Sequence, residues 1–366
     1  MKTTPTLMHV FSTFSIGGPQ VRFAAIAAHF GNTYRHMLLA MDGAYDADEK
    51  LDPGLQIERL KIDAPKKQTL RNMIIFRGAL RRIRPDVLVT YNWGALEWAL
   101  ANRPRLVTHI HFEDGFGPEE AESQFYRRVL ARRFALRKST VIVPSLNLMR
   151  MALECWRIPA GRVRYIPNGI DCARFADATK GIGVPVGNGP VIGTVASLRP
   201  EKNIRRLIAA FAKVQSRTDC RLLIAGDGSE RADLEDFARS RLRPGSFLFT
   251  GQVNRVEDVY AALDIFALSS DTEQMPTSLM EAMAAGLPLV STDVGDVSNM
   301  VTDENRPFVV DRDDEAFGNA LLRLVTDELL CAKLGGANRK SAAERFTLSG
   351  MLAAYDLLFS QACARQ

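Results

Sequence analysis

Short apolar runs alternate along this chain with longer segments in which apolar residues recur at helical spacing. Runs of about four to eight residues bounded by Gly, Pro, Asn or Asp are typical of buried strands. Such runs, some with the turn that follows, occupy residues 7–14, 36–41, 55–60, 85–92, 105–111, 140–145, 191–197, 221–228, 246–255 and 264–270. Helical spacing is found at residues 21–30, 70–83, 119–138, 204–215, 256–263, 282–285 and 348–364. This alternation predicts an α/β fold with mostly parallel, doubly wound sheets.

Length and composition favour two domains in a globular protein. The chain has 366 residues, of which 46% are hydrophobic. No apolar run approaches the roughly 18 to 20 residues of a membrane helix. The first residues, MKTTPT, lack the apolar core of a signal peptide. We therefore expect a cytoplasmic protein. The five cysteines are scattered without a C-x-x-C pair, which argues against a disulfide framework and against a zinc site.

Charge is unevenly divided between the two halves of the chain. Residues 1–171 hold 25 Lys and Arg against 16 Asp and Glu, a net charge of +9. The remainder holds 22 against 26, a net charge of −4. A basic first half suggests that its binding partner is an anionic surface or an anionic acceptor. The sequence contains none of the usual nucleic-acid-binding motifs, so nucleic acid is not an expected partner.

The stretch at residues 271–288, DTEQMPTSLMEAMAAGLP, concentrates candidate chemistry. Glu273 and Glu281 stand eight residues apart, just after the apolar run 264–270. One carboxylate is therefore expected in the loop beyond a strand and the other on the first turn of a helix. In open α/β sheets, ligands bind at that edge.

The backbone N–H groups of Thr277, Ser278 and Leu279 would lie at the N-terminus of this helix, which is a ready anion site. A purely structural interpretation is also open. Ser278 and Glu281 have the spacing of a capping box, and Gly286 would then end the helix.

Two earlier loops have the same position after a strand. Gly17 and Gly18 follow the first apolar run, and a Gly-rich loop before a helix is typical of phosphate binding, although a simple turn would use the same residues. Lys202 lies in the loop after residues 191–197, where it could meet a phosphate or be merely solvated.

The predicted strand at residues 105–111 ends in two histidines. His109 and His111 share one face, and a histidine at the carboxyl end of a strand is well placed to meet a substrate. Glu113 and Asp114 follow and could bind acceptor hydroxyls or act as a base. The alternative is that both acids only occupy a turn.

The predicted helix at residues 119–138 interleaves six basic residues with apolar ones. Such a helix could contact an anionic membrane surface. It could equally be a solvated helix with one buried stripe.

The stretch at residues 271–288 resembles the E-x7-E signature of retaining, GT-B-fold glycosyltransferases of glycosyltransferase family 4 (glycosyl transferases group 1). The matching positions are Glu273, Pro276, Ser278, Leu279, Glu281, Ala282, Met283, Gly286 and Pro288. Residues 167–171, PNGID, resemble the family's boundary motif, and the resemblance covers essentially the whole chain.

A second family motif, G-R-L-x-x-E-K, is matched with one departure. Lys202 corresponds to the lysine that neutralises the donor diphosphate, but the motif arginine falls on Ser197. Arg199 is a candidate to supply the missing charge. In the family, the backbone near Val253 and Arg255 would read the nucleotide base.

The resemblance implies two Rossmann-like domains facing each other across a cleft. Residues 1–171 would bind the acceptor, residues 172–347 the donor, and the helix at residues 348–366 would pack back on the first domain. The implied reaction is retaining transfer of a sugar from a nucleotide-diphosphate sugar to a glycan or lipid-linked acceptor, with UDP the preferred base and GDP an alternative. Polysaccharide or glycolipid synthesis would be the setting.

The resemblance also implies roles for single residues. Lys202, Arg199 and the amides from Thr277 to Leu279 would neutralise the leaving diphosphate. The sugar would be held by Glu273, His111 (with His109 as alternate), Gly17 and Gly18, and Glu281 would accept hydrogen bonds from the ribose hydroxyls.

No metal and no cofactor are expected to be required. The D-x-D pattern used by other glycosyltransferase folds occurs at residues 311–313 and 46–48, both in polar connections distant from the motifs in the sequence. Two rival hypotheses remain: a sugar-nucleotide epimerase of the same architecture, which lacks this E-x7-E form, and a non-catalytic nucleotide-sugar-binding homologue, which the Ser197 departure motivates.

Overall fold

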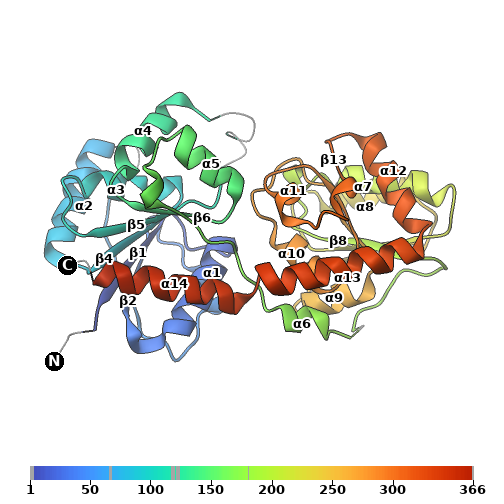
Figure 1. The fold of residues 1–366 in the computed structure, drawn as a ribbon, viewed down its shortest axis with the longest axis horizontal. Helices are drawn as coiled ribbons and strands as arrows, with labels where there is room; N and C mark the ends of the chain where they lie inside the picture. Colours follow the sequence, from blue (N-terminus) through green and yellow to red (C-terminus); the bar gives the residue numbers. More distant parts are fainter. Residues whose placement is uncertain (1–3, 66–67, 117–119, 121–123, 180, 365–366) are drawn as a thin grey trace. The chain divides into compact units, whose positions relative to one another are not determined.

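The computed structural model describes residues 4–65, 68–116, 120, 124–179 and 181–364. The chain forms two compact units (Figure 1). The first comprises Met1–Pro167 and Met351–Gln366, and the second comprises Asn168–Gly350. Each unit contains one parallel sheet covered by helices.

The first unit is built on a seven-stranded sheet in the order β3-β2-β1-β4-β5-β6-β7, and all pairings are parallel. Its strands are β1 (Thr6–Phe11), β2 (Arg35–Ala40), β3 (Ile57–Arg59), β4 (Val87–Tyr91), β5 (Thr108–Phe112), β6 (Thr140–Val143) and β7 (Val163–Tyr165). The central strand β4, VLVTY, is buried at every residue, as expected when helices cover both faces of a parallel sheet.

Helices connect these strands and supply the rest of the core. They are α1 (Gly18–Phe30), α2 (Thr69–Ile83), α3 (Leu96–Ala101), α4 (Tyr126–Leu136) and α5 (Leu146–Glu154). On one side Phe76 of α2 stacks on Trp98 of α3, with ring centroids 4.3 Å apart. Elsewhere Trp156, which follows α5, is fully buried against β6 and α4.

The second unit is built on a six-stranded parallel sheet in the order β10-β9-β8-β11-β12-β13. Its strands are β8 (Val191–Val195), β9 (Arg221–Ala225), β10 (Phe247–Gly251), β11 (Ile265–Leu268), β12 (Leu289–Thr292) and β13 (Val309–Val310). Alternate residues enter separate cores: Leu222 and Ile224 lie in one and Leu223 and Ala225 in the other. This is the two-residue period of a strand with both faces covered.

Eight helices among the described residues cover this sheet. They are α6 (Cys172–Ala176), α7 (Ile204–Gln215), α8 (Arg231–Arg241), α9 (Val256–Ala262), α10 (Thr277–Ala284), α11 (Val297–Met300), α12 (Asp314–Val325) and α13 (Glu328–Arg345). A short 3-10 helix, Pro200–Lys202, follows β8. None of the helices in the described part of the chain has the length and apolar character needed to cross a membrane.

The last helix, α14 (Leu348–Cys363), packs against the first unit along its apolar stripe. Phe359 makes edge-on contact with Phe30, and Tyr355 lies 5.6 Å from Phe112 between ring centroids. Asp356 accepts a hydrogen bond from His29 at 2.9 Å. The end of the chain thus becomes part of the first unit's core.

The prediction of two parallel α/β sheets is confirmed, but two element boundaries differ from the expected ones. The strand expected at residues 105–111 runs from Thr108 to Phe112, because its ladder with β4 begins at the pair Val87–Thr108. Helix α10 begins at Thr277, where its N-terminal amides were expected. The basic helix expected at residues 119–138 is α4 within the described residues, and its expected start lies outside them.

Candidate functional site

Lys202 and Glu273, 71 residues apart in the sequence, form an ion pair at the carboxyl edge of the second sheet. The Lys202 Nζ to Glu273 Oε1 distance is 2.6 Å. Their side chains are only 19% and 10% exposed. The Ser270 hydroxyl donates to the same carboxylate oxygen at 2.8 Å. The lysine follows β8 and the glutamate follows β11, which are neighbouring strands, so the sheet itself brings the two loops together.

Arg206 holds the two loops in place. Its guanidinium donates to Asp271 and to Asp314, each at 2.8 Å, and to the Ser269 carbonyl at 3.0 Å. The Asp271 amide in turn donates to the carbonyl of Glu201 at 2.9 Å. We did not identify Arg206 from the sequence. The available signal was an acidic residue, Asp271, directly at a strand end.

Helix α10 begins four residues after Glu273. Thr277 and Ser278 are its first two residues, where an α-helix leaves amides without an intrahelical partner. The Leu279 amide, which was expected to be free, donates to the Pro276 carbonyl at 3.2 Å. That part of the prediction was wrong, because the first turn closes tightly after the proline.

Gly295 explains how the Glu273 loop keeps its shape. It has a φ of +57°, and a Cβ there would lie 2.4 Å from the Glu273 carbonyl oxygen, so only glycine fits. The adjacent Asp296 amide donates to the Gln274 carbonyl at 2.9 Å. The loop after β12 therefore supports the loop that carries the carboxylate.

Glu281 does not form the capping box that its spacing allowed. Helix α10 has no side-chain cap, and Glu281 instead accepts a hydrogen bond of 2.7 Å from the Tyr260 hydroxyl. Burial raises the pKa of the Glu281 carboxyl to about 7, although the Tyr260 hydrogen bond and the Arg174 charge act to lower it. Gly286 does end the helix: with a φ of +78°, it donates to Met283 as in a Schellman motif.

The residues expected to contact the nucleotide have different surroundings. Arg255 is exposed and donates to Asp258 at 3.1 and 3.2 Å. Val253 is half-buried and packs against the core. Arg199 is exposed, forms an ion pair with Glu201 at 3.0 Å and donates to the Ser197 hydroxyl at 3.2 Å, so its guanidinium lies beside the residue at the position of the motif arginine.

In the first unit, Gly17 and Gly18 open helix α1 at the carboxyl edge of the sheet. Gly17 is the N-cap and Gly18 the first helical residue. No atom would lie within 4 Å of a Cβ at Gly18, so the surface there is open, whereas a Cβ at Gly17 would meet the Gln20 side chain at 2.9 Å. Close approach of a ligand to the backbone is therefore sterically possible at Gly18.

His111 lies within β5 and Glu113 directly follows this strand. Both side chains are 0% exposed. His111 Nδ1 lies 2.7 Å from the Thr90 hydroxyl and its Nε2 lies 3.4 Å from Glu113 Oε2. Glu113 also accepts from Arg132 Nε at 3.0 Å. Burial acts to raise the pKa of Glu113, but His111 and Arg132 outweigh it and lower the value. Contact of His111 with a donor sugar stays a prediction.

The interpretation of Glu113 as an acceptor-binding or turn residue is corrected by this burial. Its carboxylate neutralises Arg132, whose guanidinium lies within about 5 Å of the ring centroids of Trp93, Phe116 and Trp156. The sequence offered no signal for this pairing, because it depends on α4 packing against the end of β5.

The sequence analysis also expected His109 at the wrong end of its strand. It is the second residue of β5, so it lies near the amino-terminal edge of the sheet, opposite the edge where His111 ends the strand. Its ring nitrogens lie 2.9 Å from the Thr90 hydroxyl and 2.7 Å from the Ser139 hydroxyl. Its expected place at the end of the strand was therefore wrong, and its role as an alternate for substrate contact stays a prediction.

Asp114 is held by a two-point ion pair with Arg22 of α1, at 2.5 and 2.9 Å. Its amide donates to the Asn92 side chain at 2.7 Å. The side chain is 14% exposed, so it is neither a free base nor a solvated turn residue. Arg22 links the helix after the Gly17-Gly18 loop to the loop after β5.

Neither D-x-D pattern forms a cluster of carboxylates. Asp313 caps α12 by accepting from the Ala316 amide at 2.7 Å, and Asp48 pairs with Arg59 at 2.7 Å. Across the described residues, no group of three or more His, Cys, Asp or Glu side chains is arranged to hold a metal ion.

Two family models match this chain. Residues 16–174 match the model described as Glycosyltransferase Family 4, and residues 189–327 match the model described as Glycosyl transferases group 1.

Curated relatives of the chain are glycosyltransferases and related synthases. A GDP-mannose-dependent alpha-mannosyltransferase of Mycobacterium tuberculosis is 32% identical over 70% of this chain and 69% of its own length. The N-acetyl-alpha-D-glucosaminyl L-malate synthase of Bacillus anthracis is 26% identical over 45% of this chain and 44% of its own length. The chain spans about half the length of the first curated relatives it matches.

Among solved structures, Anabaena HepE in complex with UDP has a TM-score of 0.79, with 18% identity over 98% of this chain and 100% of that one. At this identity the likeness establishes the fold, which is GT-B.

Proposed function

The chain belongs to glycosyltransferase family 4, and from that membership we propose that it is a retaining hexosyltransferase (EC 2.4) that uses a nucleotide-diphosphate sugar. The acceptor we propose is a glycan or a lipid-linked sugar, as in polysaccharide or glycolipid synthesis. The observation that carries the proposal is the Lys202–Glu273 pair, whose glutamate lies four residues before the start of α10.

The proposed chemistry follows from the charges at this edge. Breaking the sugar–phosphate bond leaves negative charge on a diphosphate, which must be neutralised as it develops. The Lys202 ammonium, the Arg199 guanidinium and the first amides of α10 are the positive groups available. In the free protein Lys202 is neutralised by Glu273. We propose that the diphosphate takes over Lys202 and leaves the Glu273 carboxylate beside the positively charged sugar.

Glu281 is proposed to accept hydrogen bonds from the ribose hydroxyls, and Gly17 and Gly18 to contact the donor sugar. Contact by His111 is proposed as well; it requires the sugar to displace Glu113 or Thr90, which hold this buried ring in the free protein. Val253 and Arg255 would serve the base through the backbone. The preferred nucleotide is UDP, with GDP as the alternative. No metal ion or cofactor enters the proposed reaction.

The donor is identified by a thermal-shift panel of UDP, GDP, ADP, dTDP and their sugars, run in EDTA. Ligand binding to the folded state raises its stability by mass action. We expect one diphosphate family to raise the melting temperature selectively, and the matching sugar donor to be turned over in EDTA with retention at the anomeric carbon, as read by NMR. Absence of any shift would contradict the donor site, and loss of turnover in EDTA would contradict metal independence.

Donor binding is expected to depend on the protonation of Glu281. A carboxyl with a pKa of about 7 is about one-tenth ionised at pH 6, so affinity for the nucleotide sugar should rise about tenfold between pH 6 and pH 8. The sign for stability is opposite. The folded state keeps a proton on Glu281 that the unfolded chain releases. The free protein should therefore lose stability as the pH rises from about 4.5 to about 7.

Isothermal titration at pH 6, 7 and 8 measures this dependence. The matched control is Glu281→Gln, which keeps a hydrogen-bond acceptor for Tyr260 but has no charge to titrate. We expect this variant to bind weakly and equally at all three pH values. If it retained the same pH slope as the wild type, Glu281 would not be the titrating group.

Helix α4 is proposed to attach the protein to the inner face of a membrane. Its exposed surface combines Tyr126, 76% exposed, and Phe134, 61% exposed, with Arg127, Arg133 and Arg137. Aromatic and basic side chains together favour anionic lipid. This is the described part of the basic helix predicted at residues 119–138.

Sedimentation with vesicles tests this attachment. We expect binding to vesicles that contain phosphatidylglycerol but not to pure phosphatidylcholine, and several-fold weaker binding for Tyr126→Ser/Phe134→Ser. The control, Val186→Ser/Leu329→Ser, removes two apolar side chains of the second unit that are even more exposed, at 81% and 85%. Equal losses in the two variants would argue against a specific role for α4.

A further inference from the structure

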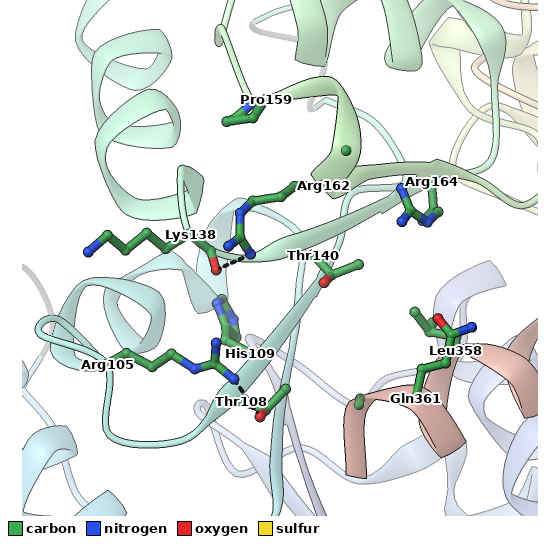
Figure 2. A pocket seen from close by; sticks show the side chains of 12 residues that line it. Arg105, Thr108, His109, Lys138, Thr140, Pro159, Arg162, Arg164, Leu358 and Gln361 are labelled. Atoms are coloured by element: carbon green, nitrogen blue, oxygen red, sulfur yellow. Dashed lines mark hydrogen bonds between the residues drawn. The ribbon is translucent and has the colours of Figure 1, made fainter. Parts of the chain in front are cut away.

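The amino-terminal edge of the first sheet carries a cavity of about 330 Å³ (Figure 2). It lies between the starts of β5 and β6, the chain around β7 and one side of α14. This is the edge at which β5 begins, whereas His111 and Glu113 lie near the end of that strand and do not line the cavity. His109, which does line it, shares the Thr90 hydroxyl with His111, at 2.9 and 2.7 Å. Its lining includes Arg105, Lys138, Arg162 and Arg164.

The cavity is positively charged and contains no carboxylate among its lining residues. Its hydrogen-bonding neutral side chains are those of Thr108, Thr140 and Gln361, together with the buried His109. In Figure 2 the Arg105 guanidinium lies beside Thr108 and the Arg162 guanidinium beside the Lys138 carbonyl, whereas the Lys138 ammonium extends away from both.

The arginines have neutral partners only. Arg105 donates to the Thr108 hydroxyl at 2.7 Å, Arg162 to the Lys138 carbonyl at 2.9 Å, and Arg164 to the Val163 carbonyl at 3.0 Å. Within the part of the chain that the structure describes, no ion pair involves any of the three. A guanidinium has five N–H donors, so each retains donors that a ligand could use.

Neighbouring hollows extend the same charge. One is lined by Arg81, Arg84 and Arg105, and another by Arg103, Arg105 and Lys138. The His109 ring cannot serve as a further ligand, because both of its nitrogens are hydrogen-bonded to hydroxyls. The ligand contacts are therefore expected from the arginines, the two threonines and Gln361.

We propose that this cavity binds a phosphate monoester group. Three guanidinium groups without counter-charge favour a ligand that carries two negative charges and several acceptor oxygens, and planar guanidinium forks match phosphate oxygens in pairs. The threonine hydroxyls and the Gln361 amide can donate to the remaining oxygens. Two sources share this chemistry: a soluble phosphorylated metabolite and phosphatidic acid, a phospholipid whose headgroup is a phosphate monoester.

The first test titrates inorganic phosphate into the protein by calorimetry, in the Lys202→Ala background to weaken binding at the donor site. Arg105→Gln/Arg164→Gln is the test variant, because both side chains are exposed and the fold should tolerate their loss. The charge-matched control is Lys213→Gln/Arg217→Gln, on the exposed surface of the second unit. We expect phosphate affinity to fall about tenfold or more in the test variant and to stay unchanged in the control.

Two results would overturn the proposal: no phosphate binding by the protein with intact arginines, or equal affinity in the test and control variants. The sources are distinguished by a second comparison. Displacement of phosphate by glycerol 1-phosphate, without binding to phosphatidic acid vesicles, identifies a soluble metabolite. Arginine-dependent binding to those vesicles identifies a lipid headgroup. Failure of the phosphate titration or of the vesicle comparison would not change the result of the nucleotide thermal-shift panel. The phosphate site and the proposed transfer activity are therefore tested independently.

Discussion

Replacing Lys202 by alanine is expected to lower kcat about 100- to 1,000-fold while changing the melting temperature little. Removing one preorganised positive group from a site of developing negative charge costs about 3 to 4 kcal/mol in the transition state. Lys202 is the one ammonium at the carboxyl edge of the second sheet that is held against Glu273 and partly shielded from water. The loss should appear mainly in kcat, since the leaving group gains its charge as the bond breaks.

The matched control is Lys213→Ala. Lys213 is an exposed lysine on α7 of the same unit, so the change in net charge is equal and only the position differs. Steady-state kinetics with the donor found in the panel gives both constants. Turnover within a few fold of wild type in Lys202→Ala would remove the diphosphate role from this residue and favour the non-catalytic homologue. Glu273→Gln offers a second measurement, because it keeps a hydrogen-bond acceptor for Ser270 but cannot stabilise a positive sugar.

Replacing Arg132 by methionine is expected to destabilise the first unit by about 3 to 5 kcal/mol. Breaking a buried ion pair by removing one partner leaves an uncompensated charge in the interior. Here Arg132 and Glu113 are both 0% exposed, and the remaining carboxylate would be left with His111 Nε2 at 3.4 Å. Since the pKa of Glu113 is lowered in the folded protein, its contribution to wild-type stability should also be lost as the pH falls.

The experiment can observe the first unit alone. All three tryptophans, Trp93, Trp98 and Trp156, belong to it, so tryptophan fluorescence during urea unfolding reports its transition and not that of the second unit. The control is Arg35→Met, which breaks the exposed pair Arg35–Glu58 in the same sheet and should cost less than about 1 kcal/mol.

A double variant separates charge from packing. Glu113→Leu/Arg132→Met removes both charges of the pair. Glu120, which lies 3.7 Å from Arg132, keeps its closer partner Arg128 at 2.8 Å. The double variant should recover much of the loss, because an apolar pair can replace a buried ion pair at little cost. If Arg132→Met cost no more than Arg35→Met, the buried pair would not be an important source of stability. If the double variant were as unstable as the single one, loss of the contacts between Arg132 and the surrounding rings would be the cause.

Much of the fold could be predicted from the sequence because its signals are local. Buried strands such as β4 are mostly continuous apolar runs, and α7 and α14 have helical spacing. Residues close together in the sequence therefore determine whether a segment is a strand or a helix. The motif at residues 271–288 is local as well. It placed Glu273 in a loop after β11 and Glu281 on α10, and the structure has both in those positions.

The predictions that failed concern partners and edges. His109 was expected at a strand end, but β5 begins at Thr108, so the register with β4 puts it at the opposite edge. Glu113 and Asp114 were expected to meet a substrate or solvent, but Arg132 and Arg22 neutralise them from helices 19 and 92 residues away. An isolated acidic residue in a sequence carries no information about which arginine will pack against it.

The sequence by itself determined the parallel α/β architecture, the family and the loops that carry the candidate residues, since periodicity and short motifs are properties of neighbouring positions. Only the tertiary structure decided that Lys202 and Glu273 form a pair, that Glu281 bonds Tyr260 rather than capping its own helix, and that three arginines surround a cavity without a carboxylate. Each of these depends on burial and on contacts between residues distant in the chain. Such contacts are set by how strands align in a sheet and how helices pack on it.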